Sequence, residues 1–221
     1  MPTPYTIKLK DTLSVIARDY GTNWKDLYNA PANAAFRAKR PNPNLIHPGD
    51  VIMVPGAGYY EVPHVTLIPQ QLNMSCWYAS AQMLIKWKTD TQRMSTGAIP
   101  PELDLESRSL RDGNTGILNP QILALANRIG LRAVPPMSPT PEAIESWLRQ
   151  YGPLWVNGKT HIVVIAGIRG MNVKVYDPAP VNIGQIGWRS LADWYAGGKP
   201  AHAESSRDTD SAVTAVFLHY P

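Results

Sequence analysis

The chain contains a single cysteine, Cys76, so no disulfide can form within it. A chain without disulfides has to be held together by buried apolar side chains, and 44% of these 221 residues are hydrophobic. Because domains commonly span about 100 to 200 residues, this length allows one ordinary domain and one small domain. The sequence therefore predicts two hydrophobic cores and a thiol that is free to react.

The start of the chain and its charge pattern restrict where the protein works. Residues 1–12 lack the apolar segment of a signal peptide, and no run approaches the ~18 apolar residues of a membrane span. We therefore expect synthesis in the cytoplasm and no membrane span. The net charge is +4, but the basic residues are scattered apart from FRAKR at residues 36–40. Scattered charges are typical of a solvated surface, so nucleic acid is not an expected partner.

The N-terminal part of the chain predicts two strands that enclose two helices. Residues 5–9 alternate apolar and polar side chains, as a half-buried strand does. Asp11 or Thr12 is expected to cap a first helix, and Asn23 a second, shorter one. A long loop then leads to a closing strand at residues 51–54. The pattern predicts a compact unit of about fifty residues, which is the small domain.

This segment, YTIKLKDTLSVIARDYGTNWKDLYNA followed by RPNPNLIHPGDVIMVP, resembles a LysM domain, a small βααβ module that binds N-acetylglucosamine-containing glycans such as peptidoglycan or chitin. One departure is Lys10, because the family usually has glycine there. The resemblance implies a LysM domain at residues 1–58, followed by a linker at residues 59–64. It also implies a glycan groove between two loops, formed by Asp11, Thr12, Leu13, Asn44, Leu45 and Ile46.

The stretch between the second helix and the last strand, PANAAFRAKR at residues 31–40, is longer than in common wall-binding LysM domains. This extended form is similar to LysM modules on proteins that travel with contractile injection machinery. The resemblance therefore implies an alternative partner for the module, namely a component of a secretion machine in place of a glycan.

The remainder of the chain predicts helices followed by strands. Helices are expected at Cys76–Lys88, Pro120–Ile129 and Pro141–Tyr151. Three β-rich runs then follow, LWVN, HIVVIAGI and VKVYDP, separated by turn residues as in an antiparallel meander. Helices first and a sheet second predict an α+β fold.

Two motifs in this region resemble papain-like cysteine peptidases, in particular the compact bacterial branch that includes bacteriocin-leader (C39-like) peptidases and secreted effector proteases. The first motif is IPQQLNMSCWYASAQM, where Gln70 precedes Cys76 at the start of a helix. The second is GPLWVNGKTHIVVIAGIRGMNVKVYDP, which places His161 at a strand start and Asp177 at the end of the next run. The resemblance implies a papain-like peptidase domain at residues 65–221.

The triad that the resemblance implies has a physical rationale. Cys76 would be the nucleophile, since a thiolate is strongly nucleophilic and the N-terminus of a helix stabilises its charge. His161 would take the thiol proton and later protonate the leaving amine, while Asp177 would orient the imidazole. A hairpin that turns around residues 169–172 would return both side chains to the same end of the sheet.

The resemblance also implies an oxyanion hole. Gln70 would donate its side-chain amide, together with the backbone N–H of Cys76, and Gln71 is the alternative donor. No set of His, Cys, Asp and Glu residues has the spacing of metal ligands, so neither a metal nor another cofactor is expected.

We therefore expect a cysteine protease that acts on a protein substrate as a secreted antibacterial or host-directed effector. Delivery by a dedicated, type VI-like machine would fit a start without a signal peptide, and a toxic protease would call for an immunity protein. Three alternatives stay open. The same thiol chemistry would serve a peptidoglycan peptidase or amidase anchored by LysM, or an acyl transferase, and a third alternative is a non-catalytic glycan-binding adaptor.

Overall fold

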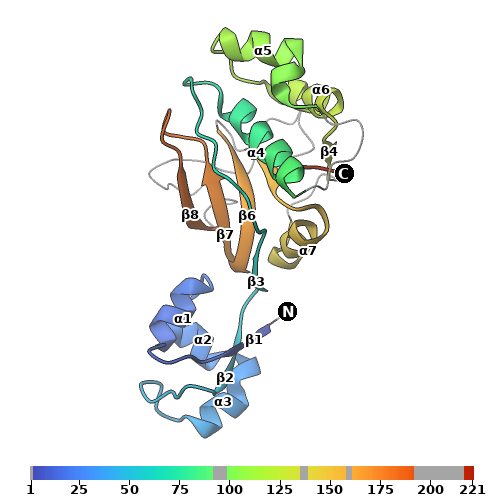
Figure 1. Cartoon of the computed structure of the whole chain (residues 1–221). Helices are drawn as coiled ribbons and strands as arrows, with labels where there is room; N and C mark the ends of the chain where they lie inside the picture. The colour runs from blue at the N-terminus through green and yellow to red at the C-terminus, as the bar shows by residue number, and fades with distance from the viewer. Residues whose placement is uncertain (1, 92–98, 135–138, 158–160, 192–216) are drawn as a thin grey trace.

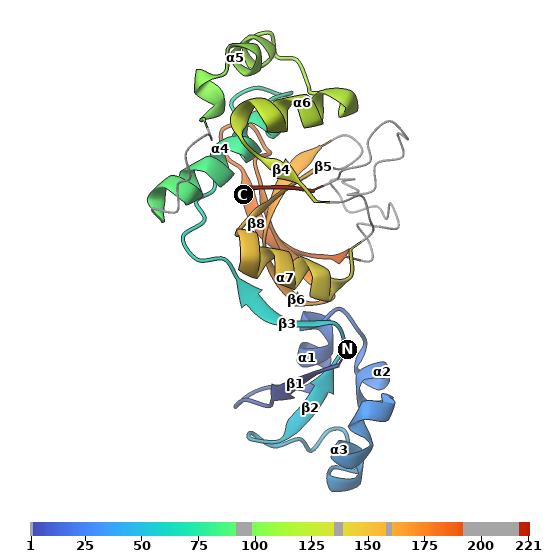
Figure 2. The ribbon, with the colours of Figure 1, turned by 90° about the vertical axis from the view of Figure 1, so that its right-hand side faces the viewer.

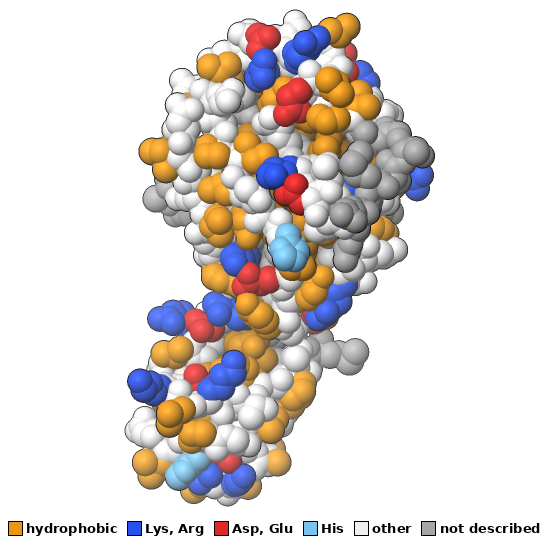
Figure 3. Space-filling model, in the orientation of Figure 1, with side chains coloured by type: hydrophobic (Ala, Val, Ile, Leu, Met, Phe, Trp, Pro, Cys, Tyr) orange, Lys and Arg blue, Asp and Glu red, His pale blue; other side chains and the backbone are white. Residues whose placement is uncertain are grey.

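The computed structural model describes residues 2–91, 99–134, 139–157, 161–191 and 217–221. Within these residues the chain forms a small N-terminal domain and a larger domain built around a sheet (Figures 1 and 2). The two bodies meet at a narrow waist, where acidic and basic side chains are mixed on the face shown in Figure 3. No helix among the described residues has the length and hydropathy needed to cross a membrane.

The small domain is a two-stranded antiparallel sheet covered by short helices. Its elements are β1 (Thr3–Thr6), α1 (Leu13–Asp19), α2 (Trp24–Asn29), η1 (Pro31–Asn33), α3 (Ala34–Lys39) and β2 (Val51–Val54). β1 pairs with β2, so that Thr3 lies opposite Val54. The side chain of Thr12 caps α1 and that of Asn23 caps α2, each by accepting a backbone N–H three residues later, as their positions predict.

The third helix, α3, lies where the sequence pattern predicts a loop. Phe36 on this helix is 6% exposed and packs edge-on against the ring of Tyr28. Just before α3, the buried amide of Asn33 donates to the carbonyls of Leu27 and Met53 and accepts the N–H of Met53 at 2.7 Å. These bonds tie the segment to α2 and β2, so contacts distant in sequence stabilise a six-residue helix whose residues favour helix but which is too short to be stable alone.

Lys10 has a φ of 72°, which lies in the left-handed region that favours glycine. Glycine, the residue that the resemblance leads us to expect at this position, would adopt this conformation without strain. The lysine has to adopt the same conformation at some cost in strain.

The larger domain combines a seven-stranded sheet with helices that pack on it. Its strands are β3 (Ala57–Glu61), β4 (Arg132–Ala133), β5 (Leu154–Asn157), β6 (Ile162–Gly170), β7 (Asn172–Asp177), β8 (Gln185–Ser190) and β9 (Phe217–His219). Its helices are α4 (Cys76–Asp90), η2 (Pro101–Leu103), α5 (Leu105–Asp112), α6 (Asn119–Ile129) and α7 (Pro141–Tyr151). The sheet order is β4-β9-β5-β6-β7-β8, all pairs are antiparallel, and β3 also pairs with β6. The predicted α+β class is confirmed.

Helix α4 supplies the centre of the main core. Trp77, Met83, Leu84 and Trp87 on this helix are each at most 2% exposed. The ring of Trp87 covers Gly152, where an added Cβ would lie 2.1 Å from the indole, and where φ is +88°. Only glycine allows this packing, which fixes α4 against the end of α7.

The two domains are joined by a set of hydrogen bonds that we call the seam. It connects the end of α1 with the turn between β6 and β7, residues 169–172. Arg169 Nε and Asn172 Nδ2 both donate to the carbonyl of Asp19, at 2.9 and 3.0 Å, and Met171 N donates to the carbonyl of Tyr20 at 3.3 Å. Because carbonyls at a helix C-terminus have no partner within the helix, the turn satisfies groups that α1 leaves open.

The connection between the domains is itself part of the larger sheet. Residues 59–64, predicted as a linker, begin within β3, and Tyr60 and Glu61 lie opposite Ile168 and Gly167 of β6. The small domain is therefore attached to the larger sheet through a paired strand as well as through the seam.

Candidate active site

Cys76 is the first residue of α4 and is partly exposed. Immediately before it, the hydroxyl of Ser75 bonds with both the N–H and the carbonyl of Leu72, which orders the loop that enters the helix. Immediately after it, the carbonyl of Trp77 accepts a hydrogen bond from the indole of Trp155 on β5 at 3.1 Å. The start of the helix, and with it the cysteine, is thus held against the sheet.

His161 lies just before β6, and Asp177 is the last residue of β7. The two strands form a hairpin whose turn falls at Met171, within the predicted turn, so the residues return to the same end of the sheet. His161 Nε2 and Asp177 Oδ1 are 2.7 Å apart, within hydrogen-bonding distance. The structure therefore brings these two predicted site residues together.

A hydrogen bond places the start of α4 beside the same end of the hairpin. Ser80, one helical turn after Cys76, donates its hydroxyl to the carbonyl of Ile162 at 3.4 Å. Ile162 is the residue that follows His161. One turn after Cys76, α4 is therefore bonded to the first residue of β6, next to the histidine.

The carboxylate of Asp177 is buried, with its side chain 1% exposed, and four groups donate to it. Oδ1 accepts the ring of His161 and the N–H of Ala179 at 2.8 Å, while Oδ2 accepts Arg189 at 2.7 Å and Gln185 at 3.3 Å. Burial by itself would raise the pKa of Asp177. The hydrogen bonds and charges of its partners, led by His161, outweigh burial and lower the pKa to about 2. The carboxylate is therefore an anion at neutral pH.

Arg189 and Gln185 are partners of Asp177 that sequence reasoning missed. Both lie on β8, and the register places Gln185 directly opposite Asp177. The only available signal was weak, since QIGWRS at residues 185–190 is short and its pairing with β7 is not apparent from local pattern. A buried acid on β7 would nevertheless have predicted a basic partner on a neighbouring strand.

Gln70 is 4% exposed and lies beside the loop that follows Asp177. Its N–H donates to the carbonyl of Pro178 at 2.9 Å, and its carbonyl accepts the N–H of Asn182 at 2.8 Å. The side-chain Nε2 donates to the carbonyls of Leu72 and Asn73, both at 3.0 Å. The residue is therefore near the predicted triad, but its amide donors are engaged in its own loop, and its oxyanion role stays a prediction. The alternative donor, Gln71, is exposed.

The residues predicted to form the glycan groove have mixed surroundings. Leu13 is only 4% exposed and belongs to the core of the small domain, whereas Leu45 is 61% exposed. The carboxylate of Asp11 accepts the hydroxyl of Tyr5 and the N–H of Lys8, each at 2.7 Å.

The other three residues of the predicted groove also differ in exposure and contacts. Thr12 caps α1, Asn44 is exposed, and Ile46 packs partly against the core of the small domain. The sugar-binding role of all six residues stays a prediction.

No group of three or more His, Cys, Asp or Glu side chains in the described part of the chain is arranged to hold a metal ion. The reactive groups of the predicted triad are a thiol, an imidazole and a carboxylate. A thiol at the start of a helix that is bonded to the residue following a histidine–acid pair is compatible with nucleophilic acyl transfer.

Comparison with known protein families gives two matches. Residues 58–195 match the family described as papain-like cysteine protease AvrRpt2. Residues 5–55 match the LysM domain. A search of curated proteins finds no match for the chain.

Proposed function

Because the chain belongs to the AvrRpt2 family of papain-like cysteine proteases and carries an N-terminal LysM domain, we propose that it cleaves peptide bonds in a protein substrate through Cys76, His161 and Asp177. One observation supports the assignment of residues. The 2.7 Å contact between His161 and Asp177 lies at the end of the hairpin to which α4 is hydrogen-bonded through Ser80, one turn after Cys76.

The first half of the reaction forms an acyl-enzyme. His161 Nδ1 removes the proton from Cys76 Sγ, and the sulfur attacks the carbonyl carbon of the scissile peptide bond. The carbonyl oxygen becomes an oxyanion in the tetrahedral intermediate. When the C–N bond breaks, the imidazolium gives its proton to the leaving amine, and a thioester remains on Cys76.

The second half releases the product. His161 takes a proton from a water molecule, whose oxygen attacks the thioester carbon. The C–S bond then breaks, a carboxylic acid leaves, and the thiol and imidazole return to their starting protonation states. Throughout, the anionic Asp177 fixes the ring through Nε2, so that Nδ1 is directed to the chemistry and the imidazolium is stabilised.

The oxyanion would be bound at the start of α4. The backbone N–H of Cys76 has no intrahelical partner, because it belongs to the first turn of the helix. For Gln70 to act as the second donor, one of the N–H groups that it gives to Leu72 and Asn73 has to turn to the oxyanion. In comparable sites the removal of one such donor costs roughly 10²- to 10³-fold in kcat.

For the biological setting, we propose an effector protease that is delivered into a target cell by a dedicated secretion machine, with its LysM domain used for loading or targeting. The resemblance of the extended LysM segment to modules carried by contractile injection machinery supports this proposal. An immunity protein would then protect the producing cell. The substrate would be a protein of the target cell.

The experiment expresses wild type and Cys76→Ala in bacteria, in cytoplasmic and in periplasm-directed forms, and measures growth together with new protein N-termini. We expect cysteine-dependent toxicity in the cytoplasm accompanied by new termini. An inert wild-type protein that also fails to react with thiol-directed inhibitors would count against a peptidase and for the adaptor alternative.

One observation favours a second candidate, a peptidoglycan peptidase or amidase. The LysM domain is bonded directly to the hairpin that carries His161 and Asp177, so a glycan on LysM would be held at a fixed position relative to the site. Under this alternative, toxicity is confined to the periplasm-directed form, and digested cell walls contain new muropeptides in the wild type and none in Cys76→Ala.

A further inference from the structure

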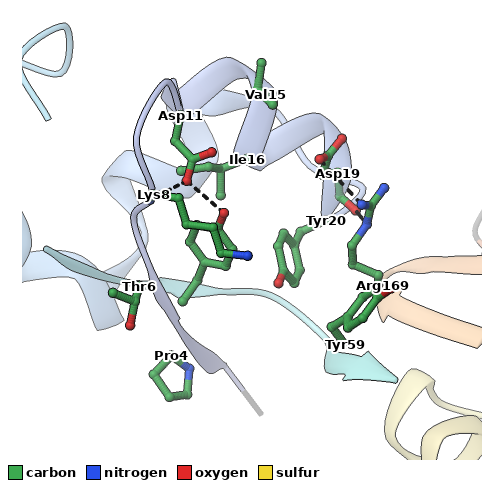
Figure 4. Close-up of a pocket in the computed structure, with 11 residues that line it drawn as sticks. Pro4, Thr6, Lys8, Asp11, Val15, Ile16, Asp19, Tyr20, Tyr59 and Arg169 are labelled. Carbon is green, nitrogen blue, oxygen red and sulfur yellow. Dashed lines mark hydrogen bonds and ion pairs between the residues drawn. The ribbon is translucent and has the colours of Figure 1, made fainter. Parts of the chain in front are cut away.

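A cavity of about 610 Å³ lies where the two domains meet (Figure 4). Its walls come from β1 and α1 of the small domain, and from Tyr59 of β3 and Arg169 of β6 in the larger domain. Neither domain encloses this space alone. Its volume is in the range of about 300 to 1,000 Å³ that is usual for sites of small ligands.

The charges around the cavity balance. Two acidic residues, Asp11 and Asp19, and two basic residues, Lys8 and Arg169, line it. Arg169 and Asp19 form an ion pair at 3.5 Å across the seam. A wall with no formal net charge does not favour an anion or a cation as the ligand, although it offers many hydrogen-bonding atoms.

The hydroxyl of Tyr20 is a polar group of the cavity wall. Tyr20 is only 6% exposed, yet its hydroxyl makes no hydrogen bond to any residue that the structure describes. In Figure 4 it points into the space between α1 and β3. The hydroxyl itself is accessible to solvent, so a ligand hydroxyl or carbonyl in the cavity would replace water as its hydrogen-bond partner.

Aromatic rings provide the apolar part of the cavity wall. The rings of Tyr5 and Tyr20 meet at a centroid distance of 5.6 Å and an angle of 70°, and Tyr59 is 57% exposed on the opposite wall. Such rings offer apolar faces next to polar edges. Pro4 lacks a backbone N–H and lies on the β1 edge of the cavity, which disfavours the addition of a peptide strand there.

We propose that this seam cavity binds one uncharged sugar ring of a glycan. A hexopyranose has an apolar C–H face that fits against a tyrosine ring, and hydroxyls that match the hydroxyl of Tyr20, the carboxylate of Asp11 and the guanidinium of Arg169. The site shares Asp11 with the loop groove predicted from the sequence, but it differs from that groove because it also requires residues of the larger domain. A bound sugar would contact both domains and so stabilise the seam.

The test measures binding of two sugar tetramers, one of N-acetylglucosamine and one of glucose, to the full-length protein by calorimetry. Tyr20→Phe removes the cavity hydroxyl alone, and Tyr59→Ala removes a ring from the wall of the larger domain. Each is expected to weaken binding about threefold to tenfold. Tyr28→Phe is the matched control, since its hydroxyl donates to the carbonyl of Arg40, away from the cavity. Leu45→Ala probes the loop groove.

Binding that falls in Tyr20→Phe and Tyr59→Ala but not in Tyr28→Phe or Leu45→Ala supports the seam cavity. The proposal is overturned if neither tetramer binds at millimolar concentration, or if only Leu45→Ala weakens binding. A neutral strand-forming peptide, Ser-Val-Ser-Val-Ser, is tested as a third ligand in the same binding assay. If it binds in a Tyr20-dependent manner and the sugars do not, the cavity is a peptide site. None of these readouts requires peptide hydrolysis, so they are independent of the proposed protease activity.

Discussion

His161 and Asp177 lie 2.7 Å apart at the open end of the β6–β7 hairpin, whereas the closed end of the same hairpin is bonded to α1 of the small domain. One supersecondary unit therefore carries the candidate catalytic pair and the docking site of the LysM domain. The position of each depends on the register of the same two strands.

Cys76→Ala should abolish peptide hydrolysis, with a loss of at least about 10³-fold in kcat/KM, because the acyl-enzyme cannot form. The measurement is turnover of a cleaved protein substrate, together with labelling by iodoacetamide. Cys76→Ser keeps the shape of the side chain and is the matched control for folding. Activity retained in both variants would remove Cys76 from the mechanism.

Stability at acid pH should depend on Asp177. Its pKa is lowered from 3.8 to about 2 in the folded protein, so its ionisation stabilises the fold above pH 4, and this contribution is lost as the pH falls toward 2. The shift corresponds to about 2 kcal/mol. Urea unfolding of wild type and Asp177→Asn at pH 6 and pH 2.5 measures it. The decrease in the free energy of unfolding from pH 6 to pH 2.5 should be smaller in the variant than in wild type, by up to about 2 kcal/mol. An equal pH dependence in the two proteins would contradict the assignment.

Arg189 should act by positioning Asp177 and not by contact with substrate. Arg189→Met removes a charged hydrogen bond to a buried carboxylate, so the free energy of unfolding should fall by about 1.5 to 3 kcal/mol. We also expect kcat to fall several-fold with little change in KM, because the ring of His161 is less firmly held. Arg189→Lys, which keeps the charge, should recover part of both losses. A change in KM alone would place Arg189 in substrate binding instead.

The seam should be sensitive to a single methyl group. Gly170 has a φ of +58°, and an added Cβ would lie 2.8 Å from the backbone of Tyr20. Gly170→Ala should therefore separate the domains and expose the 57–61 connection to protease, with a stability cost of about 2 to 3 kcal/mol. Gly187→Ala is the control, since nothing lies within 4 Å of its added Cβ. Small-angle scattering and limited proteolysis of the two variants provide the comparison. If both variants keep the compact shape, the seam is more tolerant than its contacts indicate.

Local patterns were enough to predict much of the fold. Capping side chains such as Thr12 and Asn23 determine where helices begin, because they satisfy backbone N–H groups in their own first turn. The alternation and turn residues of the β6–β7 segment predicted a hairpin, and the hairpin brings His161 to Asp177. These features depend on residues close together in the chain, which is why they can be predicted from local sequence patterns.

Tertiary structure decided the features that join distant segments. The helix α3 depends on the buried side chain of Asn33, and the buried carboxylate of Asp177 accepts a hydrogen bond from Arg189 of another strand. The engagement of the Gln70 amide and the seam between the domains arise in the same way. By itself, the sequence determined the two domains, their fold class and the candidate nucleophile, histidine and acid. The partners of these residues were decided only by packing, because hydrogen bonds between remote side chains leave no periodicity or spacing in the chain.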